Sequence, residues 1–292
     1  MHGYDAEHSL KIAIALTFAF FGVEVVGGIV SGSLSLLSDA GHMLRDVLAL
    51  IISLGAIGIA KRVPTKTKTF GYHRIEIFAA LLNGILLLGI GVWVLAEAYR
   101  RIYNPLSIES TTMLIVAAIG MVVNSYIAFK LHGSSDINVK SAYLHVITDT
   151  LSSAAVIVAS IWIFFTNQTI VDAVLAAGIA VFMLYSAFKI VKDSVHILLE
   201  FVPKNVNLDE VIKDVLSVKG VRGIHNVHLW ALCSNVHVFD AHVFTTHRDM
   251  LRIEKIKKEI KERLKKYNIK HATLEFECEE CTENEIVKNI EH

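Results

Sequence analysis

The chain has few cysteines and no excess of charge of either sign, and both absences exclude classes of protein. Its three cysteines, Cys233, Cys278 and Cys281, are an odd number that cannot all pair within one chain, which argues against a disulfide scaffold. Lys and Arg (28) balance Asp and Glu (28), so no basic excess recruits nucleic acid and no acidic excess indicates a disordered chain. Only 19% of the residues are charged whereas 53% are hydrophobic, a composition that is rare in a soluble single domain.

The sequence also lacks a clear signal-peptide cleavage site. The first apolar stretch, Lys11 to Val30, is too long for a typical signal-peptide core, so we expect a membrane helix. Crossing about 30 Å of hydrocarbon takes roughly 20 mostly apolar residues. Six segments meet that length: 11–31, 36–60, 75–100, 111–131, 141–165 and 170–192. Residues 1–202 are therefore predicted to form a six-helix transmembrane domain in a lipid bilayer.

Beyond Pro203 the pattern changes to shorter apolar runs with frequent Lys and Glu. Residues 203–292 are predicted to form a separate soluble domain, with helices at 207–218 and 249–267 and strands at 225–232, 235–244 and 271–278. This αββαβ order predicts an α+β domain in which two helices cover one face of a three-stranded sheet. The side chains expected to be buried there are Val211, Ile212, Val215, Ile253, Ile256, Ile260 and Leu264.

Positive charge marks one side of the predicted bundle. It gathers in the loop between the second and third spans, at Lys61, Arg62, Lys66, Lys68 and Arg74. Cytoplasmic loops carry an excess of Lys and Arg, so both termini are predicted to be cytoplasmic. Arg100 and Arg101 fall on the opposite side, so most of the positive residues follow this distribution, but not all.

The most informative pattern is a pair of residues that occurs twice. His42 and Asp46 lie four residues apart in the second predicted span, and His145 and Asp149 have the same spacing in the fifth. On a helix this spacing puts both side chains on one face. A single histidine is more often packed than metal-bound, but two imidazoles and two carboxylates complete a tetrahedral zinc shell, and charges within a bilayer usually mark an ion path. The pattern predicts a transport site for zinc, with cobalt and cadmium as alternatives.

Three further acidic residues belong to the predicted spans. Asp39 lies one turn before His42 and is either a polar residue of the helix start or a residue that supports the site or the entry of ions. Glu24 and Asp172 either guide ions or are paired or interfacial residues. These alternatives stay open.

Three segments resemble motifs of the cation diffusion facilitator family, in particular its zinc-transporting branch. SLSLLSDAGHMLRD (33–46) is similar to the second-span motif, FGYHRIE (70–76) to the start of the third span and AYLHVITD (142–149) to the fifth-span motif. The resemblance covers nearly the full length. It departs at Arg45, where a small polar residue is expected, and in the short loop around 132–138, which lacks a histidine-rich stretch.

The resemblance implies that His42, Asp46, His145 and Asp149 form the transport site of a homodimer that exchanges cytoplasmic metal for protons. Chemistry supports the exchange independently, because imidazole must be neutral and carboxylate ionised to hold a metal, so protons and zinc compete for the same atoms. We therefore expect a multi-pass protein of the cell membrane that exports Zn2+ by Zn2+/H+ antiport.

The resemblance also implies that the tail is a metallochaperone-like domain of ferredoxin type, which dimerises and binds additional metal. The residues that suit accessory metal sites are His225, His242, Glu277, Cys278 and Cys281. The CxxC pair, Cys278 and Cys281, equally suits an unoccupied or redox-active thiol pair. By the same resemblance, His73 is expected either at a metal site between the membrane domain and the tail or simply packed there.

Three other functions fit parts of the pattern. A membrane metal enzyme needs an open metal position and a general base, but the sequence has no HExxH and all four ligands are used in coordination. A haem carrier uses paired histidines, yet the carboxylates at the same spacing argue against haem. A metal sensor that binds zinc without transporting it would use the same ligands, so that alternative stays open.

Overall fold

The computed structural model describes residues 2–44, 47–48, 64–132, 137–234, 236–278 and 286. The chain divides into two compact units, each formed from two segments of the sequence. One contains Met1–Leu54 and Leu82–Val191, and the other contains Gly55–Leu81 and Lys192–His292. The loop before the third predicted span thus belongs to the same unit as the tail.

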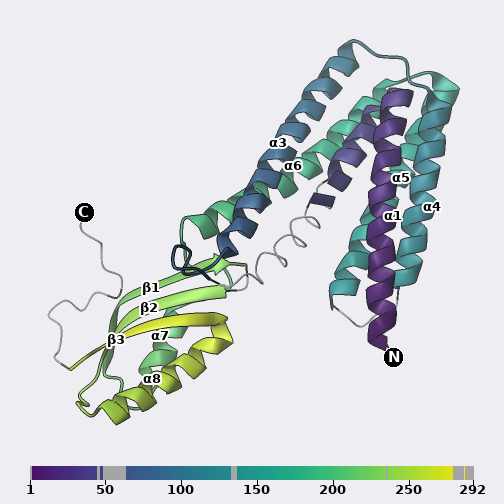
Figure 1. Cartoon of the computed structure of the whole chain (residues 1–292). Coiled ribbons are helices and arrows are strands. Elements are labelled where there is room, and N and C mark those ends of the chain that lie inside the picture. The colour runs from purple at the N-terminus through teal and green to yellow at the C-terminus, as the bar shows by residue number, and fades with distance from the viewer. Residues whose placement is uncertain are drawn as a thin grey trace. The chain divides into compact units, whose positions relative to one another are not determined.

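Long helices occupy the predicted membrane domain (Figure 1). They are α1 (His2–Ser31), α3 (His73–Tyr103), α4 (Ser110–Leu131), α5 (Ile137–Thr166) and α6 (Ile170–Leu198). Residues 34–44 form a further helix, named here the 34–44 helix, and most of the predicted span 36–60 lies outside the described residues. Among the described residues, four helices are long and apolar enough to cross a membrane: His73–Tyr103, Ser110–Lys130, Val146–Thr166 and Ile170–Leu198. A helical membrane domain is therefore confirmed, whereas the count of six spans stays a prediction.

Two groups of helices pack around the 34–44 helix. The helices α4 and α5 share a cluster that includes Met113 and Val156 and receives Leu36. The helices α3 and α6 share a cluster that includes Val94 and Ala176 and receives Leu34. The 34–44 helix therefore contacts both groups, and this places the residues that follow Leu36 between them.

The outward faces of these helices remain apolar. Val122, Phe129, Leu151 and Phe165 are each more than 60% exposed. Apolar side chains on this scale are costly in water but stable against lipid tails. Their exposure agrees with a bundle whose outer surface faces hydrocarbon.

The tail follows the predicted αββαβ order. Its elements are α7 (Leu208–Leu216), β1 (Gly223–Cys233), β2 (Val236–Phe244), α8 (Met250–Leu264), a 3-10 turn (Lys265–Tyr267) and β3 (Ile269–Glu277). Both helices begin at side-chain caps, because Asn207 Oδ1 accepts from the Asp209 amide and Asp249 Oδ1 accepts from the Leu251 amide. After α8 the chain turns at Asn268, whose φ is 58°, a left-handed conformation that asparagine tolerates.

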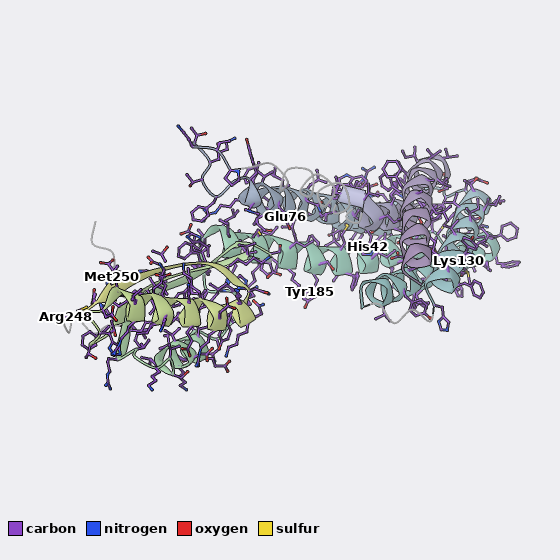
Figure 2. All side chains as sticks on the ribbon, turned by 60° about the horizontal axis from the view of Figure 1, so that its bottom comes forward. His42, Glu76, Lys130, Tyr185, Arg248 and Met250 are labelled. Carbon is purple, nitrogen blue, oxygen red and sulfur yellow. The ribbon has the colours of Figure 1, made fainter. Side chains whose placement is uncertain are left out.

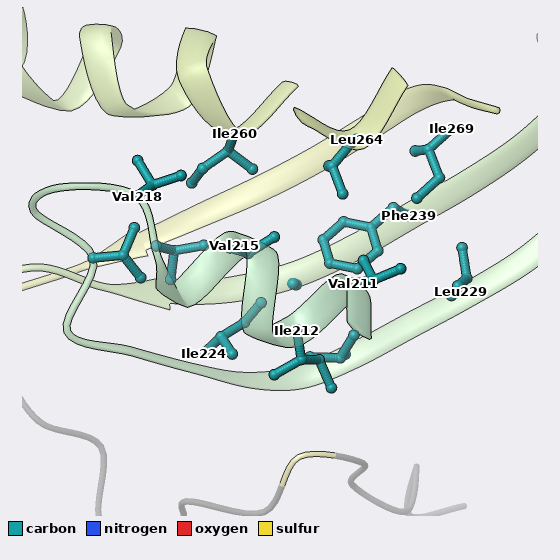
Figure 3. Close-up of a cluster of buried hydrophobic side chains, with 14 of the residues drawn as sticks. Val211, Ile212, Val215, Val218, Ile224, Leu229, Phe239, Ile260, Leu264 and Ile269 are labelled. Carbon is teal, nitrogen blue, oxygen red and sulfur yellow. The ribbon is translucent and has the colours of Figure 1, made fainter. Parts of the chain in front are cut away.

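The sheet has the order β1-β2-β3, with β1 and β2 antiparallel and β2 and β3 parallel. On β2, Phe239, Ala241 and Val243 are fully buried in the cluster with the helices. Figure 3 shows Phe239 in this cluster. Residues of a strand alternate between faces, so His242 points to the opposite face. That face carries the cluster of histidine and glutamate side chains described below.

Six of the seven side chains expected in the tail core are buried: Val211, Ile212, Val215, Ile256, Ile260 and Leu264. The prediction for Ile253 was wrong. Ile253 lies near the start of α8, where it is only partly buried and lines a surface hollow with Leu274 and Phe276. The buried residues of α8 begin only at Ile256, so helical periodicity alone overestimates the core in the first turn of this helix.

Candidate metal sites

One candidate site brings together the 34–44 helix and α5. His42 Nε2 lies 3.7 Å from Asp149 Oδ1, and the two side chains are 7% and 13% exposed. The imidazole also packs against Phe182 of α6, with ring centroids 5.9 Å apart. Figure 2 shows His42 among the helices of the bundle. An imidazole and a carboxylate from separate helices therefore meet in a largely buried place.

The other two predicted ligands are less fully described. The backbone of His145 is helical, and His145 is four residues before Asp149 on α5. Asp46 lies outside the described residues. The structure thus shows His42 of the first predicted pair close to Asp149 of the second. The complete set of four ligands stays a prediction.

Two further carboxyl groups are buried in the same bundle. Glu24 on α1 is 1% exposed and Asp39 on the 34–44 helix is 5% exposed. The hydroxyl of Ser152 on α5 donates to Asp39 Oδ1 at 2.8 Å. Asp39 is thus held by a side chain one turn beyond Asp149, and Ser152 is a neighbour that the sequence did not point to.

Asp172 at the start of α6 is paired rather than open to the surroundings. Its carboxylate is fully buried and accepts hydrogen bonds from the hydroxyls of Ser33 and Ser35 and from the amides of Leu34 and Ser35. Of the two roles that the sequence left open, the structure shows the paired one.

A second candidate site lies on the tail sheet, on the face away from α7 and α8. His242 Nδ1 is 2.7 Å from Glu277 Oε1, and His225 Nε2 is 3.3 Å from Glu277 Oε2. One potential ligand atom from each residue lies within 4.8 Å of the other two. Two imidazoles and a carboxylate are a ligand set that suits zinc and leaves one tetrahedral position for another ligand.

The register of the sheet explains how these three side chains meet. His225 on β1 is directly opposite His242 on β2, and Glu275 on β3 is opposite His242 on its other side. Glu277 is two residues further along β3 and points to the same face as Glu275. A bulge between His225 and His228 gives β1 one extra residue, and this shifts His225 from the core face to the face that carries His242.

Two neighbours complete this tail cluster, and the sequence pattern pointed to neither. Glu275 Oε2 lies 3.5 Å from His242 Nε2. Asn226 sits in the bulge with a φ of 48°, and its Nδ2 donates to His242 Nε2 at 3.1 Å. With Nε2 as the acceptor, Nδ1 of His242 carries the proton and donates to Glu277. Asn226 lies between His225 and the buried Val227, and its positive φ is a conformation that asparagine tolerates.

The predicted cysteine ligands do not join this cluster within the described part of the chain. Cys278 Sγ donates to the carbonyl of His247 at 3.5 Å and lines the hollow beside Ile253 and Phe276. Cys281 lies outside the described residues. Within the described residues, the cluster therefore consists of two histidines and one carboxylate, without a thiol.

His73 lies at the start of α3, in the unit that contains the tail. Its Nδ1 is 3.9 Å from Sγ of the buried Cys233 at the end of β1, and the hydroxyl of Ser234 donates to Glu76 Oε1 at 3.3 Å. The start of α3 thus contacts the β1–β2 hairpin. Cys233 is the neighbour of His73 that the sequence did not identify.

Comparison with known proteins gives two family matches that together span most of the chain. Residues 10–199 match the model of the cation efflux transmembrane domain, and residues 203–279 match the cytoplasmic domain of cation efflux proteins. The boundary between the two matches falls close to the change in composition at Pro203.

Individual relatives are similar over nearly their whole length. The metal cation efflux system protein CzcD of Cupriavidus metallidurans is 43% identical over 99% of this chain and 92% of that protein. The cadmium, cobalt and zinc/H(+)-K(+) antiporter of Bacillus subtilis is 35% identical over 92% of this chain and 88% of that protein. The zinc transporter ZitB of Escherichia coli is 35% identical over 93% and 88%.

Proposed function

This chain belongs to the cation diffusion facilitator family of divalent metal efflux transporters, and we propose that it exports zinc from the cytoplasm in exchange for protons. Relatives are named as transporters of zinc, or of cadmium, cobalt and zinc, so cadmium and cobalt are the alternative substrates. We propose a homodimer in the cell membrane with both termini in the cytoplasm.

One observation carries the proposed site, which is the distance between His42 Nε2 and Asp149 Oδ1. Two ligands that each lie about 2.0 to 2.2 Å from a tetrahedral zinc ion are about 3.3 to 3.6 Å apart. The measured 3.7 Å is close to that separation. A small movement of either helix would therefore allow both groups to bind one ion.

The pair spacing supplies the remaining ligands. Asp46 is four residues beyond His42, and His145 is four residues before Asp149, so each helix offers one imidazole and one carboxylate. Four protein ligands hold zinc without an additional water. Because metal binding requires neutral imidazole and ionised carboxylate, protons that reach the site from the far side would displace the metal.

The tail site supports a second role for metal in the same protein. His225, His242 and Glu277 leave one coordination position for another group. We propose that this site binds zinc as an accessory ion. The ion would then stabilise the tail, and it is not the transported ion.

Transport is favoured over the sensing alternative. The relatives are named as efflux proteins, transporters or antiporters, and both family models describe cation efflux. None of these names or descriptions points to a receptor or a sensor.

The test is zinc flux into proteoliposomes under an imposed pH gradient. The unmodified protein is compared with Asp149→Ala and His42→Ala, and Asp193→Asn serves as the control. Asp193 is an exposed acid of α6 paired with Lys204, so its removal changes charge without touching the site. We expect gradient-driven flux in the unmodified protein and in the control, and none in the two site variants.

Two results would contradict the proposal. Unchanged flux in Asp149→Ala and His42→Ala would exclude the site. Tight zinc binding by the unmodified protein without any flux would exclude transport and favour the sensor.

A further inference from the structure

Asp172 joins α6 to the first turn of the helix that carries His42. Its Oδ1 accepts from Ser33 Oγ at 2.7 Å, from Ser35 Oγ at 2.5 Å and from the Ser35 amide at 3.1 Å, while Oδ2 accepts from the Leu34 amide at 2.7 Å. The side chain is 0% exposed. All four donors belong to a segment that is more than 130 residues away in the sequence.

These bonds leave the carboxylate little capacity to bind a passing ion. An ionised carboxylate has about four lone-pair sites, and here Oδ1 accepts from three donors and Oδ2 from one. Its burial also separates it from water, so a hydrated ion cannot reach it without breaking the contacts. The geometry therefore argues against Asp172 as a transient binding site for the metal on its path through the protein.

The amides of Leu34 and Ser35 are first-turn groups of the 34–44 helix. Such groups have no acceptor within their own helix, and a carboxylate near the helix N-terminus also interacts favourably with the helix dipole. A cap usually comes from the residue just before the helix. Here Asp172 supplies it from α6, so the cap also fixes the start of the 34–44 helix relative to α6.

Two further contacts extend this attachment along the helix. Ser38 Oγ donates to the carbonyl of Ala176 at 3.3 Å, one turn beyond Asp172 on α6. Leu34 is fully buried and packs in a cluster with Ala173, Ala176 and Ala180. The small alanines let the two helices approach closely. The bonds to Asp172 therefore hold the 34–44 helix at a defined position along the axis of α6.

The position of His42 depends on where the 34–44 helix is held along α6. It is eight residues beyond Leu34, which corresponds to about 12 Å along the helix axis. A slip of one residue moves it by about 1.5 Å, enough to lose a metal–ligand contact with an ion also held by Asp149. We propose that Asp172 is a positioning residue of the transport site, which fixes the 34–44 helix on α6 so that His42 meets Asp149. This inference rests on the proposed function of His42 and Asp149.

The test compares two ways of weakening the contact between Asp172 and residues 33–35. Asp172→Asn removes the charge, whereas Ser33→Ala with Ser35→Ala keeps the carboxylate and removes two of its donors. Ser160→Ala is the matched control, because Ser160 is a buried serine whose hydroxyl bonds within its own helix, to the Ile157 carbonyl. Asp149→Ala is included as a variant that lacks a proposed ligand.

Three measurements are made on the full-length protein. Zinc flux into proteoliposomes gives KM and kcat separately, and zinc titration gives the dissociation constant. The visible absorption of bound Co2+ reports the coordination geometry, and it is recorded in a His225→Ala/His242→Ala background so that the tail site does not contribute.

A positioning role predicts that Asp172→Asn weakens zinc binding about tenfold, raises KM and changes the Co2+ spectrum. The double serine variant shifts all three in the same direction by a smaller factor, and Ser160→Ala behaves as the unmodified protein. If Asp172→Asn does not fold, the double serine variant decides the question by the same readouts.

An ion-path role predicts the reverse. Asp172→Asn would then lower kcat with KM, zinc affinity and the Co2+ spectrum unchanged, and the double serine variant would equal the unmodified protein, which would overturn the inference. Flux retained in Asp149→Ala would instead overturn the proposed transport site itself. The two failures are therefore distinguishable.

Discussion

His242 on β2 donates through Nδ1 to Oε1 of Glu277 at the end of β3, over 2.7 Å. The same Glu277 carboxylate reaches His225 on β1 through its other oxygen. One carboxylate thus bridges two histidines from neighbouring strands. Because side chains that suit zinc gather here on one face of the sheet, this cluster leads to the first prediction.

Replacing His242 by Ala should abolish zinc binding to the tail without abolishing transport. Loss of one of three ligands leaves too few groups to hold the ion. The measurement is zinc stoichiometry of the purified protein, which should fall relative to the unmodified chain while flux persists. His271→Ala is the control, since His271 is an exposed residue of the same sheet. An unchanged zinc stoichiometry in His242→Ala would contradict the proposed tail site.

Asn226 offers a way to separate backbone strain from the hydrogen bond to His242. Asn226→Ala should lower tail stability by about 1 to 2 kcal/mol, because alanine is strained at positive φ. Asn226→Gly should restore most of that loss, since glycine adopts this conformation freely. Thermal unfolding of the purified protein compares the two variants. Equal melting temperatures for both would show that the bulge imposes no strain.

Two isoleucines of α8 differ in burial, and their substitution tests which part of this helix packs in the tail core. Ile260 is fully buried between the helices and the sheet, so Ile260→Ala should destabilise the tail by about 2 to 5 kcal/mol. Ile253→Ala removes the same atoms from a partly exposed position and should cost about 1 kcal/mol or less. Unfolding of the tail by denaturant, followed by its fluorescence, gives the loss of stability in each variant. A similar cost at the two positions would contradict the packing described here.

Two glycines of α1 test its approach to α4. A Cβ at Gly27 would lie 2.5 Å from Cγ2 of Val116, whereas a Cβ at Gly22 would meet nothing within 4 Å. Gly27→Ala should therefore push the helices apart and cost about 1 to 3 kcal/mol. Gly22→Ala should be neutral or slightly stabilising, because alanine favours helix.

Detergent-solubilised melting curves of both glycine variants check this prediction. A lower melting temperature is expected for Gly27→Ala alone. Equal melting temperatures would mean that α1 does not pack closely on α4 at Gly27.

Local patterns were enough to predict much of this protein. Runs of apolar residues located the long helices, because a helix in lipid must satisfy its own backbone and expose only apolar side chains. The spacing of His42 with Asp46, and of His145 with Asp149, identified the candidate transport site, since residues four apart share one helix face. Alternating and amphipathic segments predicted the αββαβ order of the tail.

Long-range contacts decided the remaining features. The bulge at Asn226 turned His225 toward His242 although strict alternation would have placed it on the core face, because one extra residue reverses the facing of a strand. Cys278 stayed apart from that cluster, and Ile253 fell at the edge of the core. Asp172 could have guided ions or been paired, and only the packing of α6 against residues 33–35 resolved it. The sequence by itself determined which residue types lie on each helix and strand, whereas the tertiary structure decided which of them meet, because register and helix packing depend on contacts between distant segments.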